Sequence, residues 1–344
     1  MTSPIRLIAG AVSATLLLAA PASAQSVADF YKGKTIQMQI GFGPGASYDL
    51  YGRFVADYIG RYIPGNPQVV SMNMEGAGSL RVVNWLYNVA PKDGTVLATA
   101  SRAAPFAPLL GAAGGTSFDA SKFTWIGSAN NEVSTCVAWG STGITSLGQL
   151  RETELIIGGD GAGADGEQFA RVMNDLFGTR IKIVSGYPGG NAINLALERG
   201  EVRGRCGWSW SGIKAERMHW VTKSMMNVFV QFGLSKHPDL PNVEMITDYA
   251  KTDEQKQMLS LVLARQPLGR PFMAPPGVPA DRTEALRQAF MKTMQDRDFL
   301  AATEKARLEI NPLGGTAVAA LVDDVYTKVS PAVIQRTRDI LTRK

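Results

Sequence analysis

The residues best suited to binding chemistry lie in a glycine-rich stretch at 41–49, Gly-Phe-Gly-Pro-Gly-Ala-Ser-Tyr-Asp. An apolar segment at 36–40 precedes this stretch, and apolar residues recur at helical spacing over 50–62 after it. A strand, a glycine-rich turn and a helix start leave the first helix amides without partners, and the helix dipole favours negative charge there. The predicted chemistry is therefore binding of an anion by main-chain NH groups.

Further side chains could add to such a site. Arg102 follows a strand-like segment in a small-residue loop, where a guanidinium could hold a carboxylate by two hydrogen bonds; a surface ion pair is the alternative. Tyr187 precedes Pro-Gly-Gly, a rigid turn from which its hydroxyl could reach a cleft. Trp208 and Trp210 flank Ser209 just beyond a strand, either as core anchors or as an aromatic wall.

The sequence does not favour an enzyme. Residues 207–211, Gly-Trp-Ser-Trp-Ser, resemble the hydrolase motif G-x-S-x-G but end in serine, and a nucleophile needs a base. The two histidines, His219 and His237, are both expected at the surface. Residues 41–46 lack the last glycine of the dinucleotide motif, and the acids of 160–167 do not alternate as in a calcium loop. We expect no catalytic residues, no cofactor and no metal.

Residues 1–24 have the pattern of a secretory signal peptide. Arg6 precedes an apolar run that ends at Pro21, and Ala-Ser-Ala at 22–24 supplies the small residues of a cleavage site. The run is too short to span a membrane, and a buried N-terminal helix is the alternative. We therefore expect a periplasmic mature chain that starts at Gln25.

Charge and cysteine content narrow the partners and the compartment. The chain carries 35 Lys and Arg against 30 Asp and Glu, with the basic residues spread along its length. No nucleic-acid partner is expected, and the charge gives only a mild bias toward anionic small molecules. The two cysteines, Cys136 and Cys206, lie in strand-like segments and would form a disulfide in an oxidising compartment. Two buried free thiols remain the alternative.

The elements that must position these residues repeat one unit. After the first strand, loop and helix, four more strands end in loops at 75–78, 101–103, 159–166 and 185–191. Alternating strands and helices predict an α/β fold with mainly parallel sheets, in which ligands collect at the carboxyl ends of the strands. Two series of such units predict two lobes that face each other across a cleft.

The ordered loops resemble the periplasmic solute receptors of tripartite tricarboxylate transporters, the Bug or TctC-like family. The matching segments are GFGPGASYD at 41–49, EGAGS at 75–79, PKDG at 91–94, GYPGG at 186–190 and APPGVP at 274–279. The resemblance implies a two-lobed type II periplasmic binding-protein fold with a ligand cleft between the lobes. It also implies uptake of small carboxylates that are delivered to a membrane permease. The sequence differs from the family's usual pattern at 46–48 and 205–211, which indicates an atypical subgroup.

The resemblance implies that glycine-rich loops from both lobes hold one carboxylate through backbone amides and ordered water. Turn and helix-cap roles are the alternative for the residues of the first loop. Combined with the side chains above, the predicted ligand-binding residues are Phe42, Ala46, Ser47, Tyr48, Gly78, Ser79, Arg102, Ala103, Ala162, Gly163, Ala164, Asp165, Tyr187 and Trp208.

The resulting prediction is an exported receptor, monomeric, for a small organic anion. Its signal peptide is 1–24, its first lobe is 25–127 with 266–344, and its second lobe is 128–265. Tyr48, Trp208 and Trp210 motivate the hypothesis of an aromatic acid. The alternatives are a secreted α/β hydrolase-like enzyme and a ligand-sensing accessory protein of a signalling receptor.

Overall fold

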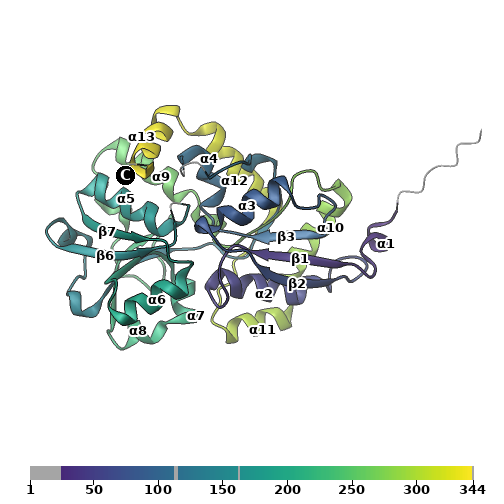
Figure 1. The fold of residues 1–344 in the computed structure, drawn as a ribbon, viewed down its shortest axis with the longest axis horizontal. Helices are drawn as coiled ribbons and strands as arrows, with labels where there is room; N and C mark the ends of the chain where they lie inside the picture. Colours follow the sequence, from purple (N-terminus) through teal and green to yellow (C-terminus); the bar gives the residue numbers. More distant parts are fainter. Residues whose placement is uncertain (1–24, 112–114, 162, 343–344) are drawn as a thin grey trace, which may run out of the picture.

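The computed structural model describes residues 25–111, 115–161 and 163–342. Figure 1 shows two lobes side by side along the long axis of the molecule, each with a sheet covered by helices. The two-lobed α/β fold predicted from the sequence is confirmed. The segment predicted as a signal peptide lies outside the described residues and stays a prediction.

The first sheet has six strands in the order β11-β4-β10-β3-β1-β2. They are β1 (Thr35–Ile40), β2 (Gln68–Asn73), β3 (Val96–Thr99), β4 (Thr124–Ser128), β10 (Pro271–Ala274) and β11 (Leu313–Gly314). β1 pairs in parallel with β2 and β3. In contrast, β10 is antiparallel to both β3 and β4, and β11 is antiparallel to β4.

The second sheet has five strands in the order β7-β6-β8-β5-β9. They are β5 (Ser134–Trp139), β6 (Glu154–Gly159), β7 (Arg180–Ser185), β8 (Gly204–Ser209) and β9 (Met226–Phe232). β6 is parallel to β7 and β8, but β5 is antiparallel to β8 and β9. Both sheets are thus mixed rather than mainly parallel. The reason is that β5 and β10 start where the chain crosses from the other lobe, so they run opposite to the neighbouring strands that end at the cleft.

Helices cover the faces of both sheets. They are α1 (Val27–Tyr31), α2 (Ser47–Ile59), α3 (Leu80–Asn88), α4 (Ala107–Leu110), α5 (Asp165–Phe177), α6 (Gly190–Arg199), α7 (Trp210–Glu216), α8 (Met218–Thr222), α9 (Asp253–Leu263), α10 (Ala280–Thr293), α11 (Arg297–Lys305), α12 (Gly315–Lys328) and α13 (Pro331–Thr342). Short 3₁₀ turns are η1 (Ala77–Ser79), η2 (Ala104–Phe106), η3 (Ala120–Lys122), η4 (Gly140–Thr142), η5 (Leu147–Arg151), η6 (Ile246–Tyr249) and η7 (Gln266–Leu268). Within the described residues, no helix is long and apolar enough to cross a membrane.

Apolar spacing explains how the helix after the first glycine-rich loop is held. α2 buries Tyr51, Val55 and Ile59, which recur every four residues and so share one face. That face packs on β1 and β2, and α10 packs against the same helix. The start of α2 is therefore fixed at the carboxyl end of β1.

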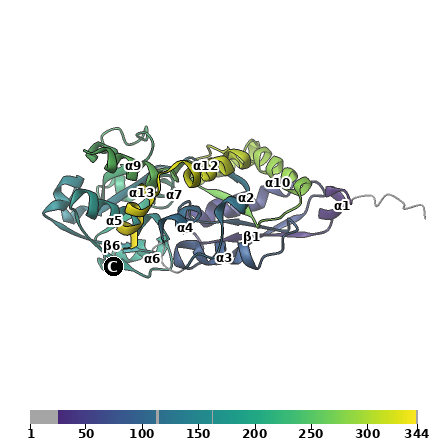
Figure 2. The same cartoon turned by 90° about the horizontal axis from the view of Figure 1, so that it is seen from above.

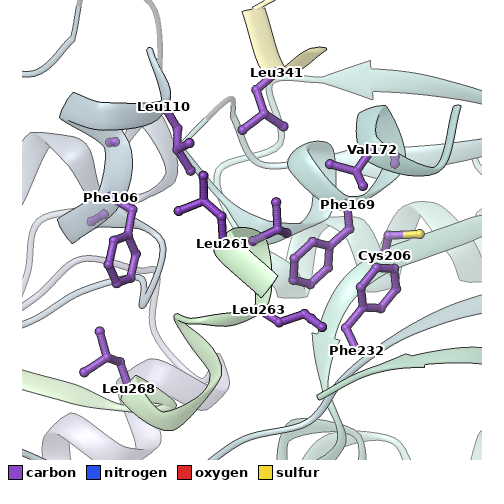
Figure 3. Packing of buried hydrophobic residues seen from close by; sticks show 14 of the residues in the cluster. Phe106, Leu110, Phe169, Val172, Cys206, Phe232, Leu261, Leu263, Leu268 and Leu341 are labelled. Atoms are coloured by element: carbon purple, nitrogen blue, oxygen red, sulfur yellow. The ribbon is translucent and has the colours of Figure 1, made fainter. Parts of the chain in front are cut away.

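Two chain segments cross between the lobes side by side. The Ala129 amide donates to the Arg270 carbonyl at 2.9 Å, and the Glu132 amide donates to the Gln266 carbonyl at 3.0 Å. The largest apolar cluster continues across this junction, and Figure 3 shows Leu110 of α4, Leu261 of α9 and Leu341 of α13 within it.

The C-terminal helices join the lobes on one face. α10 and α12 lie along one side of the molecule (Figure 2), where both contact β4. α13 contacts α4 and also packs on α5 and α9 of the neighbouring lobe. Although the predicted boundaries assign 266–344 to the first lobe, the last helix is shared between the two.

A disulfide joins two neighbouring inner strands of the second sheet. Cys136 of β5 and Cys206 of β8 are bonded, with their Cα atoms 4.0 Å apart, and both are buried. The predicted pairing is confirmed. The bond lies where the β5–β8 register shifts between Thr135 and Val137, so it holds the strand pair together where the regular ladder is interrupted.

Removing this disulfide should lower stability. The cysteines are 70 residues apart, so the Cys136→Ala/Cys206→Ala variant should lose about 4 kcal/mol of unfolding free energy through the freed unfolded chain. Chemical denaturation with and without a reductant measures the loss. The reductant should destabilise the natural protein and leave the double variant unchanged. Equal stability of the reduced and oxidised natural protein would contradict the prediction.

Candidate functional site

A small cavity of about 50 Å³ lies between the lobes at the carboxyl ends of the strands. Its lining from the first lobe is Phe42, Ala46, Ser47, Tyr48, Ser101 and Arg102. Its lining from the second lobe is Asp160, Ala164, Asp165, Gly166, Gly190, Ile193, Arg205, Cys206, Gly207, Trp208, Ser209 and Glu216. Such a volume holds only a few water molecules, so the lobes are nearly closed on each other.

Three helices begin at this cavity. α2 contributes its first residue, Ser47, with Ala46 before it; α5 contributes Asp165, and α6 contributes Gly190. None of these three helices has a side chain hydrogen-bonded to its first amides at the capping position. Their free NH groups and dipoles therefore add up to a positive potential inside the cavity.

Asp49 shapes the first glycine-rich loop through hydrogen bonds. Asp49 accepts hydrogen bonds from the Gly45 amide at 2.8 Å, the Arg53 Nε at 2.9 Å and the Asn73 Nδ2 at 2.7 Å. Gly45 has φ +76°, which favours glycine at that turn. Burial alone would raise the pKa of Asp49, but these hydrogen bonds lower it overall. The loop is thereby rigid where it meets the cavity.

Tyr48 connects this loop to the arginine at the end of β3. Its ring stacks on Phe42 with centroids 4.6 Å apart, and its hydroxyl accepts a hydrogen bond from the Arg102 amide at 3.1 Å. The Arg270 guanidinium lies 4.6 Å from the centroid of the same ring. Tyr48 is thus positioned on one wall of the cavity by contacts on three sides.

Arg102 forms the central ion pair between the lobes. Its Nε lies 2.6 Å from Asp165 Oδ2, and its Nη2 donates to the hydroxyls of Ser134 at 2.6 Å and Ser209 at 3.2 Å. Burial would lower the pKa of Arg102, but Asp165 raises it overall, so the side chain stays charged. Its Nη1 has no hydrogen-bond partner in the described protein. One buried donor of a residue that lines the cavity is therefore left without an acceptor in the described protein.

Two more buried arginines extend this network. Arg265 Nη1 lies 3.2 Å from Asp165 Oδ1, and Arg270 Nη2 lies 3.3 Å from Glu132 Oε2. All three arginines are at most 1 % exposed. Against their three positive charges the network holds the two carboxylates of Asp165 and Glu132. Within this network the arginines exceed the carboxylates by one.

The opposite wall carries groups that the sequence analysis missed. Arg205 donates to Asn194 at 2.7 Å and lies 4.2 Å above the Trp208 ring. Burial raises the pKa of Asp160 to about 6. Burial also raises the pKa of Glu216, although Arg205 and a hydrogen bond from Ser47 act against it. Arg205 opens the segment that departs from the family pattern, and this departure was the one signal that could have drawn attention to it.

The structure brings together eight of the predicted ligand-binding residues around the cavity. They are Phe42, Ala46, Ser47, Tyr48, Arg102, Ala164, Asp165 and Trp208. The cavity lining does not include Gly78, Ser79, Ala103, Gly163 and Tyr187. Ala162 lies outside the described residues. Contact of all these residues with a ligand stays a prediction.

The second glycine-rich loop contacts the facing loop directly. A Cβ at Gly78 would lie 2.8 Å from the Ala164 amide nitrogen, and one at Gly163 would lie 2.9 Å from the Ala77 carbonyl oxygen. Ser79 instead accepts a hydrogen bond from the Ser101 amide at 2.7 Å. Gly78 thus belongs to a rim where the lobes touch beside the cavity.

Ala103 and Tyr187 are engaged within their own lobes. The Ala103 amide donates to the Ser101 hydroxyl at 3.2 Å, and the Tyr187 amide donates to the Gly159 carbonyl at 3.1 Å. The Tyr187 ring lies against Gly158, 3.2 Å from the position of a Cβ there. The hydrogen bond from the Tyr187 amide to Gly159 fixes the Tyr187 loop to the end of β6.

One expectation about the histidines is wrong. His219 is exposed as predicted, but the His237 side chain is only 15 % exposed, and its Nε2 lies 3.3 Å from Glu309. Potential ligand atoms of His237, Asp239 and Glu309 fall within 4.8 Å of one another. The Lys214 ammonium pairs with both acids, at 2.8 Å from Asp239. A protein cation therefore already pairs with both acids of this group.

Comparison with known proteins places the fold. No family model matches the sequence, and no curated protein matches it. The structure is similar to the periplasmic binding protein BugD (TM-score 0.71, 16 % identity, 89 % of this chain and 98 % of that chain). It is also similar to MatC of Rhodopseudomonas palustris with bound malate (TM-score 0.68, 17 % identity, 90 % of this chain and 99 % of that chain). R. palustris Rpa4515 with adipate is similar as well (TM-score 0.67, 13 % identity, 90 % of this chain and 97 % of that chain). The resemblance seen in the sequence is confirmed at the level of the fold.

A side chain at the rim should hold the lobes apart. Gly78→Ala introduces a Cβ that meets the Ala164 backbone, whereas Gly143→Ala has similar positive φ (+69° against +62°) and nothing within 4 Å. Both variants should lose about 1 kcal/mol of stability through backbone strain. Only Gly78→Ala should increase the radius of gyration in small-angle X-ray scattering. An unchanged radius in that variant would show that the rim does not limit closure.

Proposed function

We propose that this protein is an exported solute receptor that binds a small organic anion, a carboxylate, between its lobes and delivers it to a membrane permease. The observation that carries the proposal is the convergence of three helix starts with the Arg102 guanidinium on one cavity. Helix amides and a buried arginine are donors that match a carboxylate. Delivery to a permease is supported by the resemblance in sequence and fold.

The proposed mechanism is closure of the lobes around the ligand. The cavity is too small to admit an organic acid from solution while the rim loops touch, so the lobes must separate first. The paired crossing segments at Ala129–Arg270 and Glu132–Gln266 are the proposed hinge, because the chain passes between the lobes there. Closure then replaces the water around the carboxylate by fixed NH donors.

The hydrolase alternative is disfavoured by the environment of Ser209. Its hydroxyl accepts hydrogen bonds from Arg102 and Arg270, at 3.2 Å and 3.1 Å. A guanidinium remains protonated and cannot take a proton from serine, so the arginines cannot activate it as a nucleophile. We therefore propose binding without chemical conversion.

An aromatic ligand remains part of the proposal through two side chains. Tyr48 and Trp208 line the cavity, and the Trp208 Nε1 is a buried donor without a partner in the described protein. Trp210 instead donates to Asp239 at 2.9 Å and does not line the cavity. The aromatic contribution is thus limited to one ring from each lobe.

A thermal-shift screen tests the proposed function. The mature protein is heated with aliphatic and aromatic acids and with neutral sugars of similar size, and chromatography checks that the ligand is unchanged. Stabilisation by acids with intact ligand supports the receptor. Stabilisation by sugars alone would reject the anion site, and product formation would favour the enzyme. Uptake of the ligand that survives deletion of the permease genes would favour the sensing alternative.

A negative charge introduced at the start of α2 should weaken anion binding while it stabilises the folded protein. Ala46 is the capping residue of α2, has no capping side chain and lines the cavity. Ala46→Asp should stabilise the helix by about 1 kcal/mol, yet it should abolish binding of an anion because a carboxylate then occupies the same NH groups.

The matched control is Ala46→Asn, which supplies a similar cap without the charge. It should retain most of the affinity for whichever acid the screen identifies. Titration calorimetry measures the affinities, and thermal unfolding measures the stabilities. Equal affinities of the Asp and Asn variants would place the anion elsewhere.

A further inference from the structure

Arg205 of β8 lines the cavity, yet among the described residues it forms no ion pair. The three fully buried arginines between the lobes, in contrast, are each paired with a carboxylate. The Arg205 Nη1 donates to neutral oxygens instead, at 2.7 Å to Asn194 Oδ1 and at 3.4 Å to the Gly190 carbonyl. Its Nε and Nη2 make no hydrogen bond within the described part of the chain. Two adjacent donors of one guanidinium are therefore unused.

The guanidinium is held beside the start of α6. It lies 4.2 Å from the centroid of the Trp208 ring, which is a cation–π contact. It also lies against Gly190, the first residue of α6, because a Cβ there would meet Nη2 and would lie 3.0 Å from Cζ. Trp208 and Gly190 both line the cavity. The guanidinium of Arg205 thus has a defined place at the cavity wall.

The start of α6 meets the first glycine-rich loop of the other lobe. Asn191, the second residue of α6, donates from its Nδ2 to the Pro44 carbonyl at 2.9 Å. The same loop leads into α2, where Ala46 lines the cavity. Arg205 therefore lies on the side of the cavity where two helix starts come together from opposite lobes.

The acids of the cavity lining do not occupy the unused donors. Asp160 and Glu216 attract the Arg205 charge, but neither forms an ion pair with it among the described residues. Glu216 instead accepts a hydrogen bond from Asn194 at 3.3 Å and another from Ser47. Adjacent N–H groups of a guanidinium match the two oxygens of a carboxylate. A carboxylate from outside the protein is thus an acceptor that fits Nε and Nη2.

The position of Arg205 does not depend on closure of the lobes. Its contacts are with Asn194 of α6 and Trp208 of β8, which belong to the same lobe. Arg102 is the opposite case, because it extends from the first lobe and pairs with Asp165 of the second. Opening breaks that pair but leaves the surroundings of Arg205 intact. The second lobe alone therefore presents a complete anion-binding arginine.

We propose that Arg205 binds the anionic group of the ligand directly, through Nε and Nη2 beside the start of α6, and that the second lobe captures the ligand before closure. This inference rests on the proposed function and adds its anchoring residue and its order of events. The donors of the first lobe, at the start of α2, reach the same group when the lobes close.

Pairs of an acid and its uncharged amide test the contact. An amide has nearly the shape of its acid, so altered packing weakens both compounds, whereas loss of a charge contact weakens the acid alone. The panel is propanoate, butanoate, hexanoate, hexanedioate, benzoate and phenylacetate with their amides, measured by titration calorimetry and, for weak binders, by competition. For the acid that binds most tightly, Arg205→Gln should lower affinity at least about tenfold and leave the amide nearly unchanged.

Further variants separate the contact from the fold. Arg205→Lys keeps the charge but not the planar fork, so it should recover part of the acid affinity. Gly190→Ala keeps the arginine but forces its guanidinium to move, so it should also weaken the acid more than the amide. Arg203→Gln removes an exposed arginine from the same segment and should change neither affinity. Circular dichroism checks folding, and Gly190→Ala decides the outcome if Arg205→Gln is unfolded.

Rapid mixing tests the order of capture. Arg205→Gln should lower the association rate constant of the acid, because its contact forms before closure. Asn191→Ala removes a hydrogen bond that exists only while the lobes touch, so it should raise the dissociation rate constant and leave association unchanged. Stopped-flow tryptophan fluorescence measures both constants. Unchanged association with faster dissociation in Arg205→Gln would overturn capture by the second lobe.

The outcomes separate this inference from the proposed function. Acid affinity that survives in Arg205→Gln would place the anion elsewhere in the cavity and leave the anion receptor intact. Equal loss of acid and amide would give Arg205 a purely structural role, which also overturns the inference. No binding of any acid of the panel to the natural protein would reject the proposed function together with it.

Discussion

The arrangement of both lobes depends on one buried ion pair, Arg102 with Asp165. Arg102 extends from the carboxyl end of β3 and Asp165 is the first residue of α5, so the bond joins the ligand-facing ends of two different sheets. Both side chains are buried, and loss of one partner from such a pair costs about 3–5 kcal/mol because it strands the other charge. The pair therefore defines the closed geometry, and every cavity-lining residue is placed relative to it.

This ion pair also explains why buried charge is tolerated around the cavity. A buried carboxylate is expensive unless it is paired and hydrogen-bonded, and Asp165 has Arg102 on one oxygen and Arg265 on the other. It also stands in the first turn of α5, where the helix dipole stabilises negative charge. The protein thus uses part of its own anion-binding capacity on an internal carboxylate. Only the remaining donors, such as Arg102 Nη1, are left for a ligand.

Sequence reasoning recovered the elements and the principal loops because these depend on local signals. Apolar periodicity marks β1 and α2, and the glycines between them mark the turn where the cavity opens. The antiparallel course of β5 and β10 follows from where the chain crosses between lobes, which no local pattern records. The pairing of Gly78 with Ala164 likewise depends on two loops that are distant in sequence. Such contacts decide which loop residues face the cavity and which close its rim.

The charged residues on the second-lobe side of the cavity were also beyond the reach of local sequence patterns, and they bear on which ligand can bind. Asp160 was considered only as one acid of a poor calcium loop, and Glu216 was not singled out. Both acids line the cavity, which forms only when β6, β8 and α7 are assembled. Helix starts alone would make the cavity a general anion site, since every such start favours negative charge. The acids Asp160 and Glu216 change that, because a negative group of a ligand that meets them is repelled. Selectivity in this fold can thus come from the groups that oppose the anion as much as from those that bind it.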